Sequence, residues 1–145
     1  MIRVIVAEDH PVVRSGLLQL LAEVKQVEVV GAAAGGEEAV TLASSERPDV
    51  VLMDLQMPDI DGIEATRRIR AADDGVNVVV LTAFSDRERI LDAIDAGAVG
   101  YLLKDAEPDE LVRGLEAAAR GESPLSPKAA QALSLPAPTA AGSRS

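Results

Sequence analysis

Short apolar runs alternate along this chain with stretches in which apolar residues recur every three or four positions. Runs that are apolar throughout are typical of parallel strands whose two faces are both covered. The predicted strands are Ile2–Ala7, Val27–Ala32, Val50–Met53, Val76–Leu81 and Val99–Leu103.

Helical patterns lie between and after these strands. Pro11, a residue suited to a first helical turn, precedes an apolar face formed by Val13, Leu17, Leu20, Leu21 and Val24. The other predicted helices are Glu37–Ser45, a segment after Asp61-Gly62, a segment ending before Gly97 with Ile90, Leu91 and Ile94, and one from Pro108 to Gly121. Five strand–helix units predict an α/β fold with a doubly wound, five-stranded parallel sheet.

The composition narrows the classes of function. The 145 residues suit one domain with a short tail, and 24 acidic against 14 basic residues give a net charge of -10. The sequence contains no cluster of Lys and Arg of the kind that forms a nucleic-acid-binding surface. The chain has no cysteine, which excludes thiol catalysis and cysteine-ligated zinc. Without a signal-peptide pattern or a membrane-length apolar run, we expect a soluble cytoplasmic protein and no membrane partner.

The polar residues that follow the predicted strands are the best candidates for chemistry. Strand one ends in Glu8-Asp9, strand three in Asp54, strand four in Thr82 and strand five in Lys104. In a doubly wound sheet, ligands bind outside the carboxyl ends of the strands. We therefore expect all five side chains to lie at one edge of the sheet.

Three carboxylates at one edge would repel one another. If strands one and three are neighbours, as in the flavodoxin-like order 2-1-3-4-5, then Glu8, Asp9 and Asp54 converge. A single Asp at a strand end is more often a helix cap. Three acids beside Thr82 and Lys104 favour a bound cation, and ligands that are all oxygen favour Mg²⁺.

Four separated motifs carry a resemblance to a known family. VIVAEDHPVVRSGL, DVVLMDLQMPDIDGIEA, VVVLTAFSD and GAVGYLLKD resemble the receiver domain of two-component response regulators, over roughly residues 1–121. EDHPVVRSGL, GAVGYLLKDAEPDEL and the LSP after the last helix look like the NarL/FixJ (LuxR-type) branch. In that branch a helix-turn-helix DNA-binding domain usually follows the receiver.

The resemblance implies a metal site and a phosphoacceptor. Asp54 would accept the phosphoryl group and contribute to the metal site, and Asp9 would bind Mg²⁺ directly. Glu8 would complete the acidic pair, and the backbone carbonyl of Gln56 would be a further ligand. Glu8 stands where many receivers have Asp, so its contact with the metal is expected to run through water.

The resemblance also implies a switch. Thr82 would hydrogen-bond the phosphoryl group, Lys104 would pair with it, and Tyr101 would change rotamer on activation. Self-phosphorylation and self-dephosphorylation are then expected, but no catalysis of another substrate. The implied partners are a sensor histidine kinase, a second copy of the chain after phosphorylation, and DNA through an output domain only.

The residues after the last predicted helix differ in character. A short helix is predicted from Ser126 to Leu133, and PAPTAAGSRS after Leu135 is typical of a flexible linker. We therefore divide the chain into a receiver at 1–121 and a linker or tail at 122–145. This tail would lead to a helix-turn-helix output domain absent from the chain.

Three alternatives stay open at this stage. A haloacid dehalogenase-type phosphatase also uses a strand-end Asp with Mg²⁺, but it needs a second Asp where this chain has Gln56. A flavodoxin relative would need a phosphate-binding loop after strand one, where EDHPVV is acidic and has no glycine. A pseudo-receiver, an interaction module that is never phosphorylated, is the best alternative.

Overall fold

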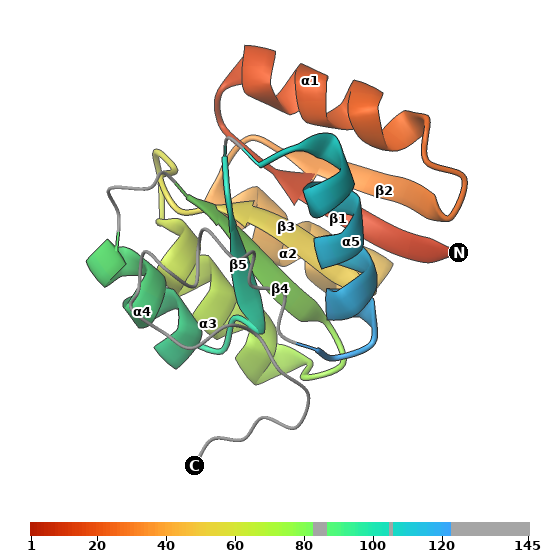
Figure 1. Cartoon of the computed structure of the whole chain (residues 1–145). Coiled ribbons are helices and arrows are strands. Elements are labelled where there is room, and N and C mark those ends of the chain that lie inside the picture. The colour runs from red at the N-terminus through yellow and green to blue at the C-terminus, as the bar shows by residue number, and fades with distance from the viewer. Residues whose placement is uncertain (83–86, 105, 123–145) are drawn as a thin grey trace.

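A five-stranded parallel sheet forms the centre of the protein in this computed structural model, which describes residues 1–82, 87–104 and 106–122 (Figure 1). The order of the strands in the sheet is β2-β1-β3-β4-β5, as the sequence predicts. The strands are β1 (Ile2–Ala7), β2 (Val27–Ala33), β3 (Val50–Asp54), β4 (Asn77–Thr82) and β5 (Gly100–Leu103).

Five helices cover the two faces of this sheet. They are α1 (Pro11–Ala22), α2 (Gly36–Glu46), α3 (Gly62–Ala72), α4 (Arg87–Asp95) and α5 (Pro108–Ala119). Apolar residues of α1 and α5 pack on one face, and those of α2, α3 and α4 pack on the other. The doubly wound α/β architecture predicted from the sequence is therefore confirmed.

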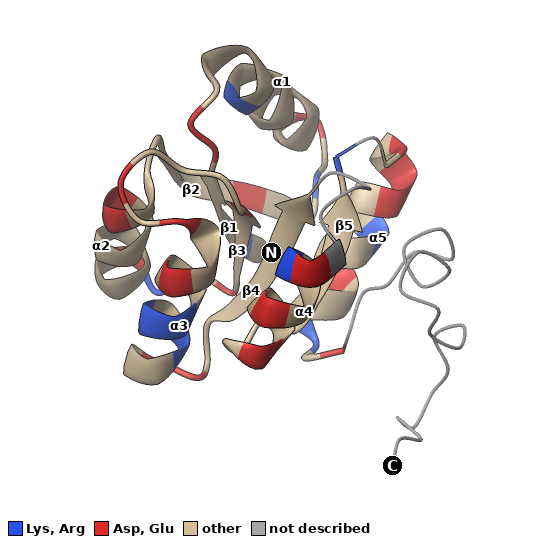
Figure 2. Ribbon diagram, turned by 90° about the vertical axis from the view of Figure 1, so that its left-hand side faces the viewer, with Lys and Arg blue, Asp and Glu red and all other residues tan. Residues whose placement is uncertain are grey.

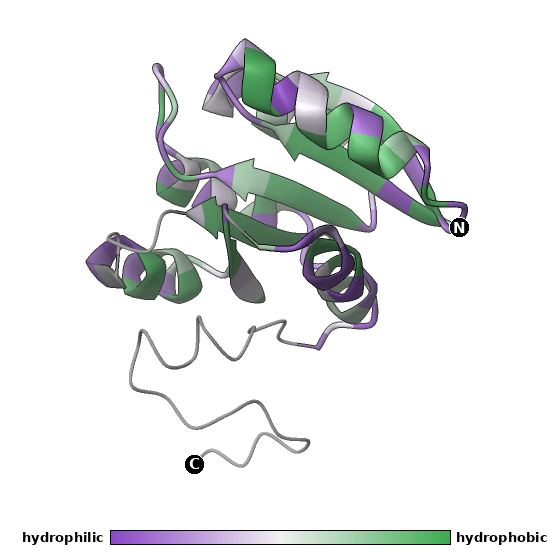
Figure 3. Ribbon diagram, turned by 45° about the horizontal axis from the view of Figure 1, so that its top comes forward, coloured by the Kyte–Doolittle hydropathy of each residue, from purple (hydrophilic) through white to green (hydrophobic). Residues whose placement is uncertain are grey.

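Successive residues of one strand serve opposite layers of the core. In β1, Val4 and Val6 contact the α1/α5 layer, whereas Ile5 and Ala7 contact the other layer. All four are fully buried, and the strands carry apolar residues along their length (Figure 3). This explains why the strand sequences are apolar throughout rather than alternating.

Three apolar residues of predicted helix faces lie in solvent instead of the core. Val13 is 37% exposed, although the sequence places it on the apolar face of α1. At 3.6 residues per turn it lies about 80° around the helix from the fully buried Leu21, so that part of the prediction was wrong. In α4, Ile90 is buried, but Leu91 and Ile94 are exposed.

The helix boundaries follow local signals in the sequence. Gly97 and Gly121, predicted as helix stops, have φ angles of 117° and 79°, a region that favours glycine. The side chain of Asp61 accepts a hydrogen bond from the Glu64 N–H and so caps the start of α3.

Two sequence predictions concern residues that the structure does not describe. The short helix predicted from Ser126 to Leu133 and nearly all of the 122–145 tail lie outside the described residues. Within the described ranges, no helix is both long and apolar enough to cross a membrane.

Candidate functional site

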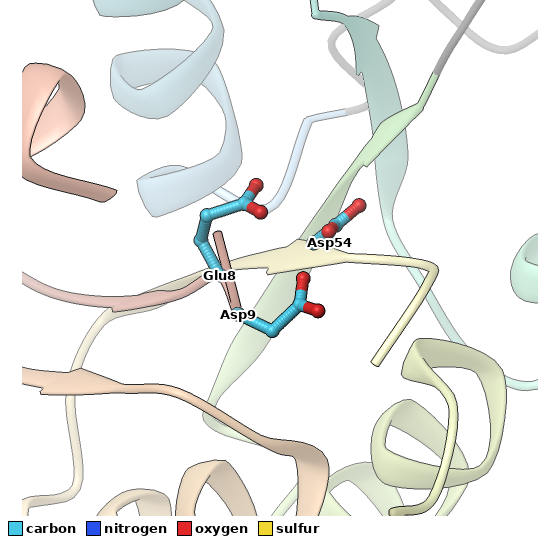
Figure 4. Close-up of side chains that lie close together, drawn as sticks. All are labelled: Glu8, Asp9 and Asp54. Atoms are coloured by element: carbon cyan, nitrogen blue, oxygen red, sulfur yellow. The ribbon is translucent and has the colours of Figure 1, made fainter. Parts of the chain in front are cut away.

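Three carboxylates meet at the carboxyl ends of β1 and β3. Glu8 and Asp9 directly follow β1, and Asp54 is the last residue of β3. One oxygen atom from each lies within 4.8 Å of the others, and Figure 4 shows the three side chains close together. The convergence predicted from the order of the strands is thus present.

The three carboxylates differ in their access to water. Glu8 is 0% and Asp54 is 2% exposed, whereas Asp9 is exposed. Burial is the main reason why the pKa of Glu8 rises from 4.5 to about 7, and the neighbouring Asp54 carboxylate raises it further. Buried acids that repel each other require a positive partner.

Lys104 supplies part of that positive charge. Its Nζ lies 3.0 Å from Asp54 Oδ1 and 3.8 Å from Glu8 Oε1. Partial burial of the ammonium group lowers the pKa of Lys104, but the ion pair with Asp54 outweighs this effect and raises the pKa overall. One lysine leaves an excess of negative charge among three carboxylates.

The donor set fits a hard divalent cation. Glu8 Oε2 accepts a hydrogen bond from the His10 N–H at 3.1 Å, whereas Glu8 Oε1 is buried without a hydrogen-bond partner among the described residues. Such an oxygen can be satisfied by a cation or by its water shell. Three clustered carboxylates with no His or Cys ligand match the preferences of Mg²⁺.

Thr82 and Tyr101 lie at the adjoining part of the sheet. Thr82 ends β4, is 1% exposed, and its carbonyl accepts a hydrogen bond from the Lys104 N–H at 2.9 Å. Tyr101, on β5, is 0% exposed, and burial raises the pKa of its hydroxyl to about 12. Thr82 is thus bonded to Lys104 and follows Leu81, the residue that pairs with Asp54 across the sheet, whereas Tyr101 lies three residues before Lys104 on β5. The switch roles of Thr82 and Tyr101 stay predictions.

Gln56 lies two residues beyond Asp54, in the loop between β3 and α3. Its backbone N–H is 3.5 Å from Asp54 Oδ1, and its side chain is exposed. The proximity of this backbone to the phosphoacceptor candidate agrees with the sequence prediction. The role of the Gln56 carbonyl as a metal ligand stays a prediction.

The glycine that starts α3 allows the loop after Asp54 to close. The Gly62 N–H donates to the Leu55 carbonyl at 2.8 Å. A Cβ at position 62 would overlap the Asp54 carbonyl oxygen and lie 2.8 Å from Leu55 Cα. The Thr66 hydroxyl donates to the Gly62 carbonyl at 2.7 Å. These contacts pack α3 directly against the backbone that carries Asp54.

Sequence reasoning missed several polar residues that support the site. Arg14 of α1 donates to the Glu8 carbonyl at 2.8 Å. Asp59 accepts from the N–H groups of Gly36 and Glu37 at 2.8 and 2.9 Å. Neither contact can be predicted from neighbouring residues. Asp59 joins segments that are distant in sequence, and Arg14 reaches back across the loop between β1 and α1. The cap at Asp61, in contrast, could have been predicted from the sequence, because Asp followed three residues later by Glu is typical of a helix start.

Comparison with known proteins decides the family. The model of the family "Response regulator receiver domain" matches residues 4–116, which is most of the chain. The protein belongs to the response regulator receiver domain family. The match lies inside the 1–121 range that the sequence suggested, and it agrees with the resemblance rather than with the phosphatase or flavodoxin alternatives.

The relatives of this receiver include regulators of the NarL/LuxR type. It is 45% identical over 122 residues to the uncharacterized transcriptional regulatory protein YxjL of Bacillus subtilis (strain 168), covering 84% of this chain and 56% of that protein. It is 39% identical to the nitrate/nitrite response regulator protein NarL of Escherichia coli (strain K12), covering 85% and 57%. The receiver thus spans little more than half the length of these curated relatives.

A solved structure agrees with the fold of this receiver. A LuxR-family two-component response regulator from Aurantimonas sp. SI85-9A1 superposes with a TM-score of 0.86 at 38% identity. The match covers 92% of this chain and 96% of that one. The predicted branch of the family is therefore confirmed by both sequence and structure.

Proposed function

We propose that this receiver acts in the cytoplasm and accepts a phosphoryl group on Asp54 from a sensor histidine kinase, with Mg²⁺ bound beside it. One observation carries the proposal: a buried Asp54 carboxylate lies 3.0 Å from the Lys104 ammonium and within 4.8 Å of two further carboxylates. This arrangement combines a nucleophile, a fixed cation and a set of oxygen ligands.

The chemistry follows from charge. A carboxylate oxygen of Asp54 attacks phosphorus, and the bond from phosphorus to the histidine nitrogen of the donor breaks, leaving its electron pair on that nitrogen. Lys104, already paired with Asp54, would stabilise negative charge on the transferring phosphoryl oxygens. Glu8, Asp9, Asp54 and the Gln56 carbonyl would hold Mg²⁺, which supplies further positive charge when bound.

We further propose that the acyl phosphate changes the surface of the receiver. The Thr82 hydroxyl would bond the phosphoryl group, and Tyr101 would then repack within β5 and its neighbours. The phosphorylated receiver would form a homodimer and thereby control transcription. The contacts with DNA would be made by a helix-turn-helix output domain, not by this chain. The protein would undergo self-phosphorylation and self-dephosphorylation without acting as an enzyme on other substrates.

The direct test is intact-protein mass spectrometry after incubation with acetyl phosphate. The wild type and Asp54→Asn are compared with Mg²⁺ and with a chelator, and circular dichroism establishes that both are folded. We expect one phosphoryl adduct in the wild type, only with Mg²⁺, and none in Asp54→Asn. A folded wild type without an adduct would refute the proposal and favour a pseudo-receiver. An adduct that persists in Asp54→Asn would place the phosphoacceptor elsewhere.

A further inference from the structure

An arginine on α4 reaches the loop that follows Asp54. Arg89 Nη2 donates to the Leu55 carbonyl at 3.2 Å and to Asp61 Oδ2 at 3.3 Å. These contacts join α4 to residues 34 and 28 positions earlier in the chain. The Arg89 side chain is 35% exposed, so water screens this pairing only in part.

Both acceptors already take part in closing that loop. The Leu55 carbonyl also accepts from the Gly62 N–H at 2.8 Å, and Asp61 Oδ1 accepts from the Glu64 N–H at 2.9 Å. One bond joins the two ends of the loop, and the other starts α3. Arg89 therefore contacts the loop at the place where its two ends meet, one residue beyond Asp54.

From these contacts we infer that Arg89 is a positioning residue, which holds the 55–62 loop in the shape that phosphorylation of Asp54 requires. The inference rests on the proposed function, since it concerns the same reaction. A charge-assisted bond to a backbone carbonyl restrains a loop more strongly than a neutral one. Loss of this bond would let the Gly62–Leu55 bond open more often and let the backbone at Gln56 shift.

The same contacts make α4 a second point of control over the site. Ile90 anchors α4 in the core, whereas Leu91 and Ile94 are exposed on it. A partner that draws α4 away from α3 would break the two bonds of Arg89. Because coupling between two sites is reciprocal, any partner whose binding depends on this position of α4 would also sense the phosphorylation state.

The chain offers a matched control in the same region. Arg67 and Arg89 line one polar groove between α3 and α4, which lie side by side and carry both acidic and basic residues (Figure 2). Arg67 pairs with Glu64 of its own helix, and in the part of the chain that the structure describes it forms no hydrogen bond or ion pair with the 55–62 loop. Arg67→Gln therefore removes the same charge from the same groove and leaves the loop contacts in place.

Two readouts test the inference, and one of them needs neither metal nor phosphoryl donor. The first is the exchange rate of the Gly62 amide, followed by NMR on ¹⁵N-labelled, chelator-treated protein. The second is the rate of adduct formation from acetyl phosphate with saturating Mg²⁺. Both are measured for the wild type, Arg89→Gln, Arg89→Lys and Arg67→Gln.

We expect Arg89→Gln to speed Gly62 exchange and to slow adduct formation, each by roughly fivefold or more, the lower end of typical coupling between sites. Arg89→Lys should recover part of both effects, because an ammonium group can also donate to a carbonyl and a carboxylate. Arg67→Gln should behave like the wild type. If Arg89→Gln fails to fold, Asp61→Asn replaces it, since Asn still caps α3 but offers Arg89 no charge.

The outcomes separate this inference from the proposed function. Wild-type rates in Arg89→Gln, with an adduct formed normally, would overturn the role of Arg89 and leave Asp54 as phosphoacceptor. Equal effects in Arg67→Gln would also overturn it, because they would show a general effect of charge in the groove. Absence of an adduct in every variant would refute the proposed function, while Gly62 exchange would still decide whether Arg89 holds the loop.

Discussion

At the scale of single residues, the site depends on two side chains of a charged type that usually lies at the protein surface. Glu8 and Asp54 are carboxylates, yet both are almost completely buried. Buried charges are tolerated only when they are paired or bind a cation. Lys104 pairs with Asp54 at 3.0 Å, and the negative charge that this pair leaves uncompensated fits a bound cation.

Gly62 is a second residue whose identity the site requires. We predict that Gly62→Ala lowers the free energy of unfolding by about 1–3 kcal/mol, because the added methyl group would overlap the Asp54 backbone. Urea unfolding measures the change. Gly16→Ala is the matched control: no atom lies within 4 Å of its added Cβ, and alanine favours a helix, so it should stabilise by roughly 0.5–1 kcal/mol. Equal stability of Gly62→Ala and the wild type would contradict the close approach of Gly62 to the Asp54 backbone.

At the scale of elements, one loop receives polar contacts from three helices. Asp59 in the loop between β3 and α3 caps α2, Asp61 caps α3, and Arg89 reaches the loop from α4. Asp59 and Asp61 accept hydrogen bonds from backbone N–H groups that the starts of α2 and α3 would otherwise leave without a partner. Arg89 is a second donor to the Leu55 carbonyl, which the Gly62 N–H already reaches. The conformation of the loop is therefore a property of all three helices, and changes near Asp54 can spread to each of them.

The cap on α2 has a pH dependence that can be tested. Hydrogen bonds from the Glu37 and Gly36 N–H groups hold the pKa of Asp59 below its usual 3.8. The ionised form is favoured in the folded protein, so its contribution to stability is present above pH 3.8 and is lost as the pH falls through the lower folded pKa. We expect Asp59→Ala to destabilise the protein at about pH 7, and the difference from the wild type to shrink below pH 3.8.

Urea unfolding over a pH series measures this difference. Asp109→Ala is the control, since it removes an exposed carboxylate from the first turn of α5 and changes the net charge equally. A difference for Asp59→Ala that stays constant down to the lowest pH, or one that Asp109→Ala reproduces, would argue against the cap.

At the scale of the whole molecule, the balance of charge is strongly acidic. The net charge is -10, and three of the carboxylates converge at one edge of the sheet. A cation that binds the folded protein there stabilises it by mass action. We predict that Mg²⁺ at 100 times its dissociation constant raises the free energy of unfolding by about 2.7 kcal/mol.

Denaturant unfolding at constant ionic strength, with Mg²⁺ exchanged for Na⁺, measures this stabilisation. Asp9→Asn keeps the size of an exposed side chain and removes a predicted ligand, so most of the Mg²⁺ effect should disappear. An undiminished effect in Asp9→Asn would mean that Mg²⁺ only screens the acidic surface.

Much of the fold and part of the site follow from local sequence patterns. Every predicted strand is present with its ends within one residue of the prediction, since continuous apolar runs such as Val50–Met53 reflect burial on both faces. Pro11 starts α1, and Gly97 and Gly121 have the positive φ angles of helix stops. Glu8, Asp9, Asp54, Thr82 and Lys104 could be placed together because parallel strands end at a common edge.

The rest depended on contacts between segments far apart in the chain. Periodicity alone did not place Val13, Leu91 or Ile94 in solvent, because exposure depends on where a helix rests on the sheet. Nor does the sequence around Arg89 indicate that it reaches Leu55, since a long side chain can point to many partners. The sequence by itself thus determined the elements, their order and the acidic edge, which arise from local periodicity and strand ends. Tertiary structure decided the burial of Glu8, the closed loop after Asp54 and the reach of α4 to it, because these depend on packing across the whole fold.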